Sequence, residues 1–249
     1  MKKTKKRRTL KSRKRESESR RLSSKERKRK ILLGAMEVFA RKGFLSTTTL
    51  ELAESLRISE ALLFKHFPKK DDLVRAVEDE IKVNMDQLFS TVLKLPPKAE
   101  SLALSIAFNI MVLVEGHGLG PSRTTLDRLA IFSLLGDGRF FRRTTEENLP
   151  PYYEFLDECL DDAKRRKELV ETKIQTKNAI WFCHHIAAFI ILAESSKAIS
   201  YQGDAPSRNL EALEFCLRGL GFTEKAVRKY ASRSWLEENT TAFAIAERP

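Results

Sequence analysis

Apolar residues recur every three or four positions along most of the chain, which is the spacing of one helical face. The first such stretch has apolar residues at 31, 35, 38 and 39 and predicts a helix from Ser23 or Ser24 to about Arg41. Gly43 follows and favours a C-terminal stop. No strand-like alternation stands out, and Gly (10) and Pro (8) are both scarce. The pattern therefore predicts an all-α fold.

Two short helices joined by a tight turn are expected next. The segment Thr48-Thr49-Leu50-Glu51 fits a capping box, in which a hydroxyl and a carboxylate each satisfy a backbone N–H. Ser59 is a good N-cap for the second short helix, and Pro68 ends it. Such a helix-turn-helix can place its second helix in the major groove of double-stranded DNA. With Leu63 and Phe67 facing the core, the outward residues are Ser59, Glu60, Leu62, Phe64, Lys65 and His66.

The remaining helices are longer and more apolar. After a helix from about 71 to 93, Pro96-Pro97 make a break, and further helices are expected at about 99–115, 122–135, 139–165, 172–199, 207–220 and 223–238. Pro150-Pro151 either kink or divide the helix that contains them. We expect nine or ten helices in three parts, namely a basic tail (1–24), a helix-turn-helix domain (25–85) and a helical domain (86–249).

Charge is unevenly distributed. The chain carries a net charge of +12, but residues 1–30 hold 17 basic and 3 acidic residues. Residues 31–80 hold 7 basic and 9 acidic residues, so we expect this part alone to bind DNA weakly. The tail fits neither a secretory signal nor a transit peptide. It is either a solubilising segment or an arm for nucleic acid, with contacts expected from Lys5, Lys6, Arg7, Arg8, Arg13, Lys14 and Arg15.

A family resemblance sharpens the helix-turn-helix prediction. The run from Gly43 to Ala53 (GFLSTTTLELA) resembles the glycine, aromatic, paired-threonine pattern of the tetracycline-repressor (TetR/AcrR) family. The run from Ile58 to Leu73 (ISEALLFKHFPKKDDL) resembles the recognition helix and following helix of that family. The two runs agree in spacing without gaps over roughly residues 25–80. The later helices agree with the family only in number, length and order.

The resemblance implies roles for individual residues. Thr48 would bind a phosphate at a helix start, Phe64 would give apolar contact in place of the usual Tyr, and Arg57 stands where the family has a turn Gly. DNA contact is implied for Thr47, Thr48, Ser59, Glu60, Ala61, Leu62, Phe64, Lys65, His66 and Lys70. A packed, hydrogen-bonded His66 is the alternative for that residue.

The C-terminal part is expected to hold an effector and to dimerise. A pocket lined by Asn109, Glu115, Trp181, His184 and His185 is expected by analogy, although satisfied core or interface polar groups are the alternative. The leucine stripe Leu210, Leu213, Leu217 and Leu220 is expected at a four-helix homodimer interface, or in the core of one subunit.

Other classes of protein lack support in the sequence. We find no metal-binding HExxH, phosphate-binding Gly loop or nucleophile elbow, so neither an enzyme, a cofactor nor a bound metal is expected. Cys159, Cys183 and Cys216 are widely spaced, which suits buried small side chains in a reducing cytoplasm, with a redox switch as the alternative. The apolar run 179–193 contains His184 and His185 and is too short for a membrane span.

These observations predict a cytoplasmic, sequence-specific DNA-binding regulator. We expect a homodimer on a palindromic operator, with repression relieved when a small apolar or amphipathic molecule shifts the spacing of the recognition helices. Activation instead of repression stays open. The rival function is a sequence-independent nucleic-acid binder driven by the basic tail.

Overall fold

The computed structural model describes residues 23–115, 123–170, 174–196 and 199–245. These residues form twelve helices and no strand longer than an isolated bridge. The helices are α2 (Ser24–Lys42), α3 (Thr49–Ser55), α4 (Glu60–His66), α5 (Lys70–Val92), α6 (Ala99–Glu115), α7 (Arg123–Leu134), α8 (Arg139–Thr145), α9 (Leu149–Arg165), α10 (Thr176–Ser196), α11 (Ala205–Gly219), α12 (Glu224–Tyr230) and α13 (Arg233–Ile245). The predicted all-α fold is confirmed.

Two predicted helices are each divided in the structure. The helix expected over 139–165 becomes α8 and α9, and Pro150 and Pro151 lie in the first turn of α9, where a missing N–H costs nothing. The helix expected over 223–238 becomes α12 and α13. The Ser232 hydroxyl accepts a hydrogen bond from Trp235 N and so begins a new helix. The expected total of nine or ten helices was therefore too low.

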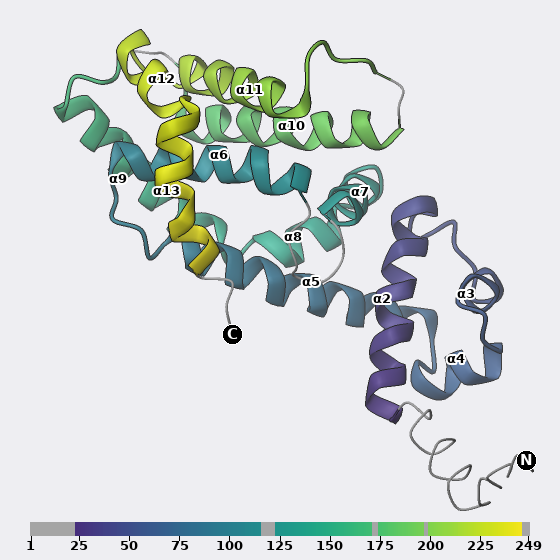
Figure 1. Ribbon diagram of the computed structural model, residues 1–249. Coiled ribbons are helices and arrows are strands. Elements are labelled where there is room, and N and C mark those ends of the chain that lie inside the picture. The colour runs from purple at the N-terminus through teal and green to yellow at the C-terminus, as the bar shows by residue number, and fades with distance from the viewer. Residues whose placement is uncertain (1–22, 116–122, 171–173, 197–198, 246–249) are drawn as a thin grey trace, which may run out of the picture.

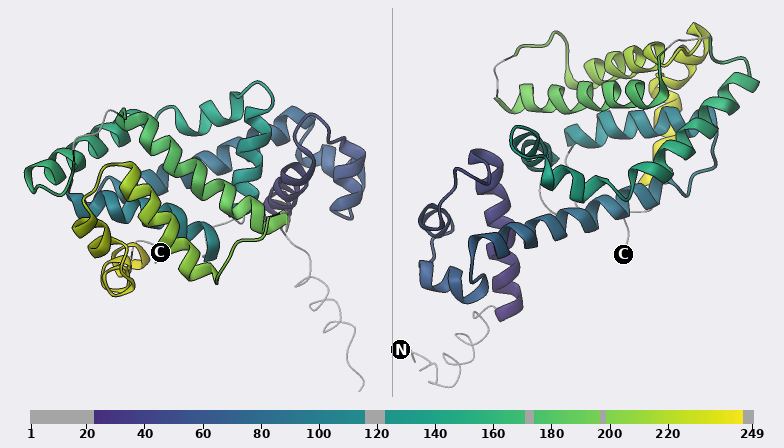
Figure 2. Two further views of the ribbon diagram at one scale, coloured as in Figure 1. Left: turned by 90° about the horizontal axis from the view of Figure 1, so that it is seen from above. Right: turned by 180° about the vertical axis from the view of Figure 1, so that it is seen from behind.

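The first three described helices and the start of α5 form one unit, and the later helices form a larger one (Figure 1). In the larger unit α10 and α11 lie side by side over α6. Helix α5 extends from the smaller unit along the underside of the larger one (Figure 2). It crosses the domain boundary expected at residue 85 without a break, so both units share this helix.

Buried apolar side chains form two clusters, one for each unit. The cluster of the smaller unit is built around Phe39, Leu52 and Leu63 and extends to Leu129 of α7 and Phe140 of α8. The cluster of the larger unit joins α6, α9, α10, α11 and α12. Helices α7 and α8 thus contribute directly to the hydrophobic core of the smaller unit.

Candidate nucleic-acid interface and cavity

The start of α3 is fixed by a capping box. Thr48 Oγ1 accepts a hydrogen bond from Glu51 N at 3.2 Å, and Glu51 Oε2 accepts one from Thr48 N at 2.9 Å. Lys42 Nζ also donates to Glu51 at 2.6 Å. These bonds, the one from Lys42 foremost, lower the pKa of Glu51 to about 2. The predicted capping box is confirmed, and Thr48 is exposed at a helix start, where backbone N–H groups favour an anion.

Thr47 and Thr48 face in opposite directions. Thr47 is buried, and its hydroxyl donates to the Gly43 carbonyl at 2.7 Å. This bond closes the loop after α2, where Gly43 has a φ of 81°. Thr47 therefore stabilises the loop, and the expectation of a DNA contact applies to Thr48 alone of the pair.

Helix α4 presents one face to solvent and the other to the core of the smaller unit. Its N-cap Ser59 accepts a hydrogen bond from Leu62 N, and Leu63 is buried against α2 and α3. Ala61, Phe64 and Lys65 are exposed, whereas Glu60, Leu62 and His66 are half-buried. The predicted outward residues of α4 therefore lie at the surface, and their contacts with DNA stay a prediction.

The turn between α3 and α4 contains an unusual backbone conformation. Arg57 has a φ of 54°, which is the left-handed region that glycine occupies at low cost. This is one of the two positions at which the sequence departs from the family pattern that it resembles. The expected turn geometry is present, and the side chain of Arg57 is exposed beside the surface of α4.

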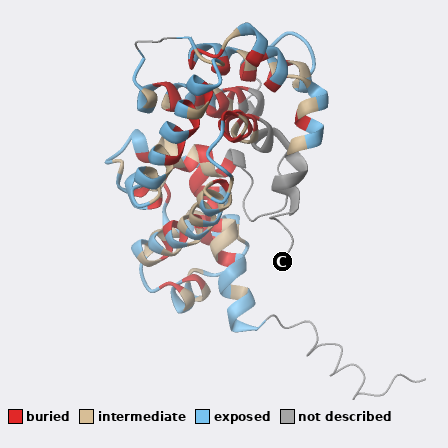
Figure 3. Ribbon diagram, turned by 90° about the vertical axis from the view of Figure 1, so that its left-hand side faces the viewer, coloured by how far each residue is buried: buried red, intermediate tan, exposed pale blue. Residues whose placement is uncertain are grey.

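The first turns of α2 add positive charge beside α4. Lys25, Lys28, Arg29 and Lys30 lie on this helix, and its beginning is exposed (Figure 3). Lys28 Nζ lies 5.1 Å from the ring centroid of Phe67, the residue that ends α4. The charge count over residues 1–30 grouped these cations with those of the tail, although the helix was expected to begin at Ser23 or Ser24. Because they belong to an ordered helix, the helix-turn-helix unit is more basic than the sequence division suggested.

Two other predicted DNA contacts can be placed. Lys70 is half-buried at the start of α5, where its Nζ donates to the Leu45 carbonyl at 3.5 Å. The seven basic residues of the predicted arm lie outside the described residues. Their contact with DNA stays a prediction.

The larger unit encloses a cavity of about 180 Å³ between α5, α6, α7, α8, α9 and α10. Asn109, Trp181 and His184 lie on its wall, as the sequence analysis expected. Asn109 Nδ2 is 3.4 Å from His184 Nδ1, and Trp181 Nε1 donates to Tyr153 at 2.7 Å. The cavity is therefore lined by polar groups that already hydrogen-bond one another.

Two of the five expected cavity residues are not placed on this wall. His185 is exposed and stacks on Trp181 with ring centroids 5.9 Å apart. Neighbouring helix positions point about 100° apart, so His184 and His185 face different surroundings. The side chain of Glu115 lies outside the described part of the chain.

The structure adds cavity residues that sequence reasoning missed. Asp127 of α7 and Phe140 of α8 both line the cavity and are buried. Phe140 also belongs to the core of the smaller unit, and its ring centroid is 5.4 Å from that of Phe44. An acidic residue on an otherwise apolar helix face was the available signal for Asp127. Nothing in the local sequence distinguishes Phe140 from other core aromatics.

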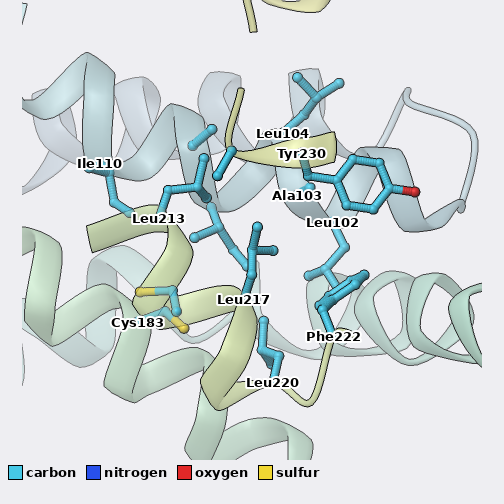
Figure 4. Close-up of a cluster of buried hydrophobic side chains, with 14 of the residues drawn as sticks. Leu102, Ala103, Leu104, Ile110, Cys183, Leu213, Leu217, Leu220, Phe222 and Tyr230 are labelled. Atoms are coloured by element: carbon cyan, nitrogen blue, oxygen red, sulfur yellow. The ribbon is translucent and has the colours of Figure 1, made fainter. Parts of the chain in front are cut away.

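The leucine stripe of α11 faces the interior of its own subunit. Leu213, Leu217 and Leu220 are buried in the core of the larger unit, and Leu210 packs against that core. Figure 4 shows Leu213, Leu217 and Leu220 among side chains of α6 and α10 and near Phe222. These leucines are not available to a second copy. The expectation that placed them at a dimer interface is corrected in favour of its alternative, the core of one subunit.

Helices α10 and α11 both carry exposed aromatic side chains. Phe182 and Phe189 on α10 are 57% and 61% exposed, and Phe215 on α11 is 66% exposed. We call these three residues the aromatic face. Since α10 and α11 lie side by side (Figure 2), the aromatic face spans the two helices in which the sequence analysis expected the dimer contact.

We also searched the described residues for metal-ligand clusters, membrane-spanning helices and reactive cysteines. Within them, no three His, Cys, Asp or Glu side chains are grouped as metal ligands would be, and no helix is long and apolar enough to cross a membrane. Cys159, Cys183 and Cys216 are all buried and reduced, and burial raises the pKa of Cys159 to about 12. A thiol with such a pKa stays protonated and reacts slowly.

The fold and the site together define a class of protein. An exposed recognition helix stands on a three-helix unit, and a long shared helix connects that unit to a helical domain with a cavity. This arrangement joins a helix-turn-helix unit to a second, all-helical domain. Residues 31–77 match the model of the family described as "Bacterial regulatory proteins, tetR family", and this segment contains α3 and α4.

Individual proteins of known sequence or structure are also similar to this chain. The uncharacterized HTH-type transcriptional regulator YuxN of Bacillus subtilis (strain 168) is 24% identical over 135 residues, which are 54% of this chain and 40% of that protein. The chain thus spans less than half the length of this curated relative. AmtR of Mycobacterium smegmatis has a TM-score of 0.57 at 21% identity, covering 88% of this chain and 96% of that structure.

A second solved structure carries ligands. AibR, in complex with isovaleryl coenzyme A and operator DNA, has a TM-score of 0.56 at 21% identity and covers 76% of this chain and 97% of that structure. At these identities the likeness concerns the fold. The matched family is described as regulatory proteins, and the curated relative as a transcriptional regulator.

Proposed function

We propose that this chain is a sequence-specific DNA-binding transcriptional regulator that represses as a homodimer and is released by a small molecule. The observation that carries the proposal is the surface of α4. Its exposed residues Phe64 and Lys65 lie within the segment that matches the tetR family, and Phe67 at the end of α4 contacts Lys28 of the basic start of α2. Lysine reads guanine edges and aromatic rings contact thymine methyl groups in the major groove.

The backbone of DNA is contacted from two helix starts. Thr48 offers a hydroxyl and the N-terminus of α3, and Lys25 and Lys28 offer cations at the start of α2. Contacts to phosphate fix orientation, whereas contacts from α4 specify sequence. We therefore expect substitutions of Lys25 or Lys28 on α2 to weaken binding to all DNA sequences alike.

The homodimer is formed through the aromatic face. Three aromatic rings that are more than half exposed on adjacent helices are unusual for a surface that faces only water. Packing the same face of a second copy against them gives a two-fold, four-helix interface. Two-fold symmetry of the protein then matches two-fold symmetry of a palindromic operator.

Effector binding is communicated through α7 and α8. Phe140 lines the cavity and packs in the core of the helix-turn-helix unit. Thr125 Oγ1 donates to Glu37 of α2 at 2.8 Å, two residues before the cavity residue Asp127. A ligand that moves α7 or α8 therefore moves α2, and a ligand that favours one position of this unit shifts the DNA-binding equilibrium. AibR, whose structure holds both isovaleryl coenzyme A and operator DNA, supports a ligand-responsive role for this fold.

Selection from a random duplex library tests the proposal. Full-length protein is compared with a variant that lacks residues 1–22, because Ser23 caps α2 and has to be retained. We expect both proteins to enrich the same palindrome, with weaker binding and a shallower salt dependence for the shortened one. Retained DNA without an enriched motif contradicts the proposal.

One observation favours a second function. Residues 1–30 hold 17 basic and only 3 acidic residues, which suits a binder of any nucleic acid. That function predicts a steep salt dependence that vanishes with the tail, and no effect of substitutions on α4. The double variant F64A/K65A distinguishes the two, because it removes side chains from α4 and leaves the tail intact.

A further inference from the structure

Helix α7 contacts both the cavity and the smaller unit. Leu126 and Ala130 are four residues apart, so they lie on one side of the helix, and both line the cavity. Thr125 and Leu129 have the same spacing and lie on a neighbouring side. The Thr125 hydroxyl donates to Glu37 of α2, and Leu129 is buried in the core of the smaller unit. A displacement of α7 by a ligand therefore acts directly on that unit.

Phe132 extends the second side of α7 to the loop between α2 and α3. We call residues 43–48 the α2–α3 loop. A Cβ on Gly43 would lie 3.1 Å from Cδ1 and 3.4 Å from Cγ of Phe132, so the ring packs directly against the glycine. Gly43 is buried and has a φ of 81°, which glycine adopts at low cost. The first residue of the loop is thus held against α7.

A second aromatic ring holds the next residue of the loop. The ring centroid of Phe44 lies 5.4 Å from that of Phe140 on α8 and 5.1 Å from that of Phe39 on α2. Phe140 also lines the cavity. Two neighbouring loop residues therefore rest on rings of α7 and α8, the two helices that connect the cavity to the smaller unit.

The α2–α3 loop in turn positions two residues that are expected to contact the DNA backbone. Thr48 is its last residue, and the Thr47 hydroxyl ties the end of the loop to the Gly43 carbonyl at 2.7 Å. Lys70 Nζ donates to the Leu45 carbonyl in the middle of the loop at 3.5 Å. A shift of the loop therefore moves both expected backbone contacts together.

We propose that Phe132 is a positioning residue for DNA binding, whose ring seats the α2–α3 loop and so lets α7 set how strongly the protein binds the DNA backbone. This inference rests on the proposed function and names the step that is regulated. Phosphate contacts carry no sequence information, whereas α4 reads the bases. Displacing the loop from Phe132 therefore weakens binding to every duplex by the same factor and leaves the sequence preference unchanged.

Fluorescence anisotropy with the full-length protein tests the proposal without an effector. Affinity is measured at several salt concentrations for the selected palindrome and for duplexes with one base pair changed in each half-site. We expect Phe132→Ala to lose on the order of tenfold in affinity for all of these duplexes, as the loss of a hydrogen bond to a charged group does. The salt slope should fall by about one for each phosphate contact that is lost. Wild-type affinity and slope, or a loss confined to the palindrome, overturns the proposal.

Two further variants separate positioning from stability. Leu134→Ala removes an exposed apolar side chain of the same helix and is expected to bind like the wild type. Phe132→Leu keeps an apolar side chain near Gly43 and should show a smaller loss, again equal for all duplexes. An unfolded fraction lowers the concentration of active protein but does not change the salt slope. If the alanine variant does not fold, a wild-type slope for Phe132→Leu overturns the proposal.

A double-mutant cycle with Thr48→Ala tests whether Phe132 acts through the loop. The loss caused by Phe132→Ala should shrink in the Thr48→Ala background, because one contact that the loop positions is already absent. Equal losses in both backgrounds contradict the proposal. A wild-type protein without sequence preference refutes the proposed function and this inference together. A wild-type protein that selects a palindrome, with a Phe132→Ala variant that binds identically, refutes this inference alone.

Discussion

The smaller, helix-turn-helix unit and the larger unit with the cavity differ in what determines which face of each helix is buried. In the first, local signals fix each helix end, and the caps at Thr48 and Ser59 place the outward face of α4. In the second, long apolar helices have two faces that both suit burial, and only packing decides which one is covered. The leucines of α11 are covered, whereas Phe215 on the same helix is exposed. Polar capping therefore specifies the orientation of short helices, and hydrophobic periodicity alone does not specify that of long ones.

The largest expected effect comes from the buried side of α11. Leu217→Ala should lower the free energy of unfolding by about 2–5 kcal/mol, because Leu217 is fully buried and the substitution leaves a cavity. Chemical denaturation measures this change. Its matched control is Phe215→Ala on the opposite face, which should change dimer dissociation measured by analytical ultracentrifugation far more than the denaturation of the subunit. Equal destabilisation by the two variants would contradict the assignment of faces.

A smaller effect is expected on α4. Lys65→Ala should weaken binding to the selected site by about 1–3 kcal/mol, as the loss of one base contact does. Fluorescence anisotropy on the selected duplex at fixed salt measures the change. Val83→Ala, an exposed position of α5 outside the interface, serves as the control and should leave affinity unchanged. An equal loss for both variants would exclude α4 as the reading helix.

Coupling between the two units can be weakened without touching DNA or ligand. Thr125→Val removes the hydrogen bond to Glu37 while it preserves the shape of the side chain. We expect the coupling free energy, which is obtained from the ratio of DNA affinities with and without effector, to fall by about 0.5–2 kcal/mol, with little change in effector affinity. Anisotropy titrations at saturating and zero effector give this ratio. If the ratio stays at the wild-type value, coupling does not pass through this contact.

Removing backbone strain at Arg57, in the turn between α3 and α4, should stabilise the smaller unit slightly. A left-handed residue other than glycine costs about 1–2 kcal/mol, and the extra chain entropy of glycine offsets up to about 1 kcal/mol. Arg57→Gly should therefore raise the midpoint of thermal unfolding by a small amount. Arg57→Ala keeps the strain and serves as the control. A lower midpoint for the glycine variant than for the alanine variant would show that the turn is not strained.

The cap of α3 makes stability depend on pH. The pKa of Glu51 is lowered in the folded protein, so its contribution is fully present above the unfolded value and is lost as pH falls toward about 2. Glu51→Gln should therefore melt at a lower temperature than the wild type at pH 7. The difference should shrink between about pH 4.5 and pH 2, which thermal melts at several pH values measure. A constant difference would mean that charge plays no part.

Sequence reasoning identified the helix-turn-helix because its signals are local. The capping residues, the turn and Pro68 each act on neighbouring backbone, so their pattern specifies α3 and α4 without tertiary information. It also predicted that α2 begins at Ser23 or Ser24, but its charge count grouped the cations of the first turns of α2 with the tail.

The cavity was only partly accessible to the same reasoning. Trp181 and His184 can be noticed in the sequence because they carry polar atoms on an otherwise apolar helix. Phe140 cannot, because it lines the cavity and also packs against Phe44, which lies far earlier in the chain. The two prolines of α9 allowed either a kink or a division. Only the structure shows that the break precedes them.

The specificity ratio of the wild-type protein tests the central claim most directly. Affinity is measured at one salt concentration for the selected palindrome and for a scrambled duplex of the same composition. The account predicts a ratio of at least about 10³ in favour of the palindrome, with two protomers on each duplex. A ratio near one would contradict it and would make the chain a binder of DNA without regard to sequence.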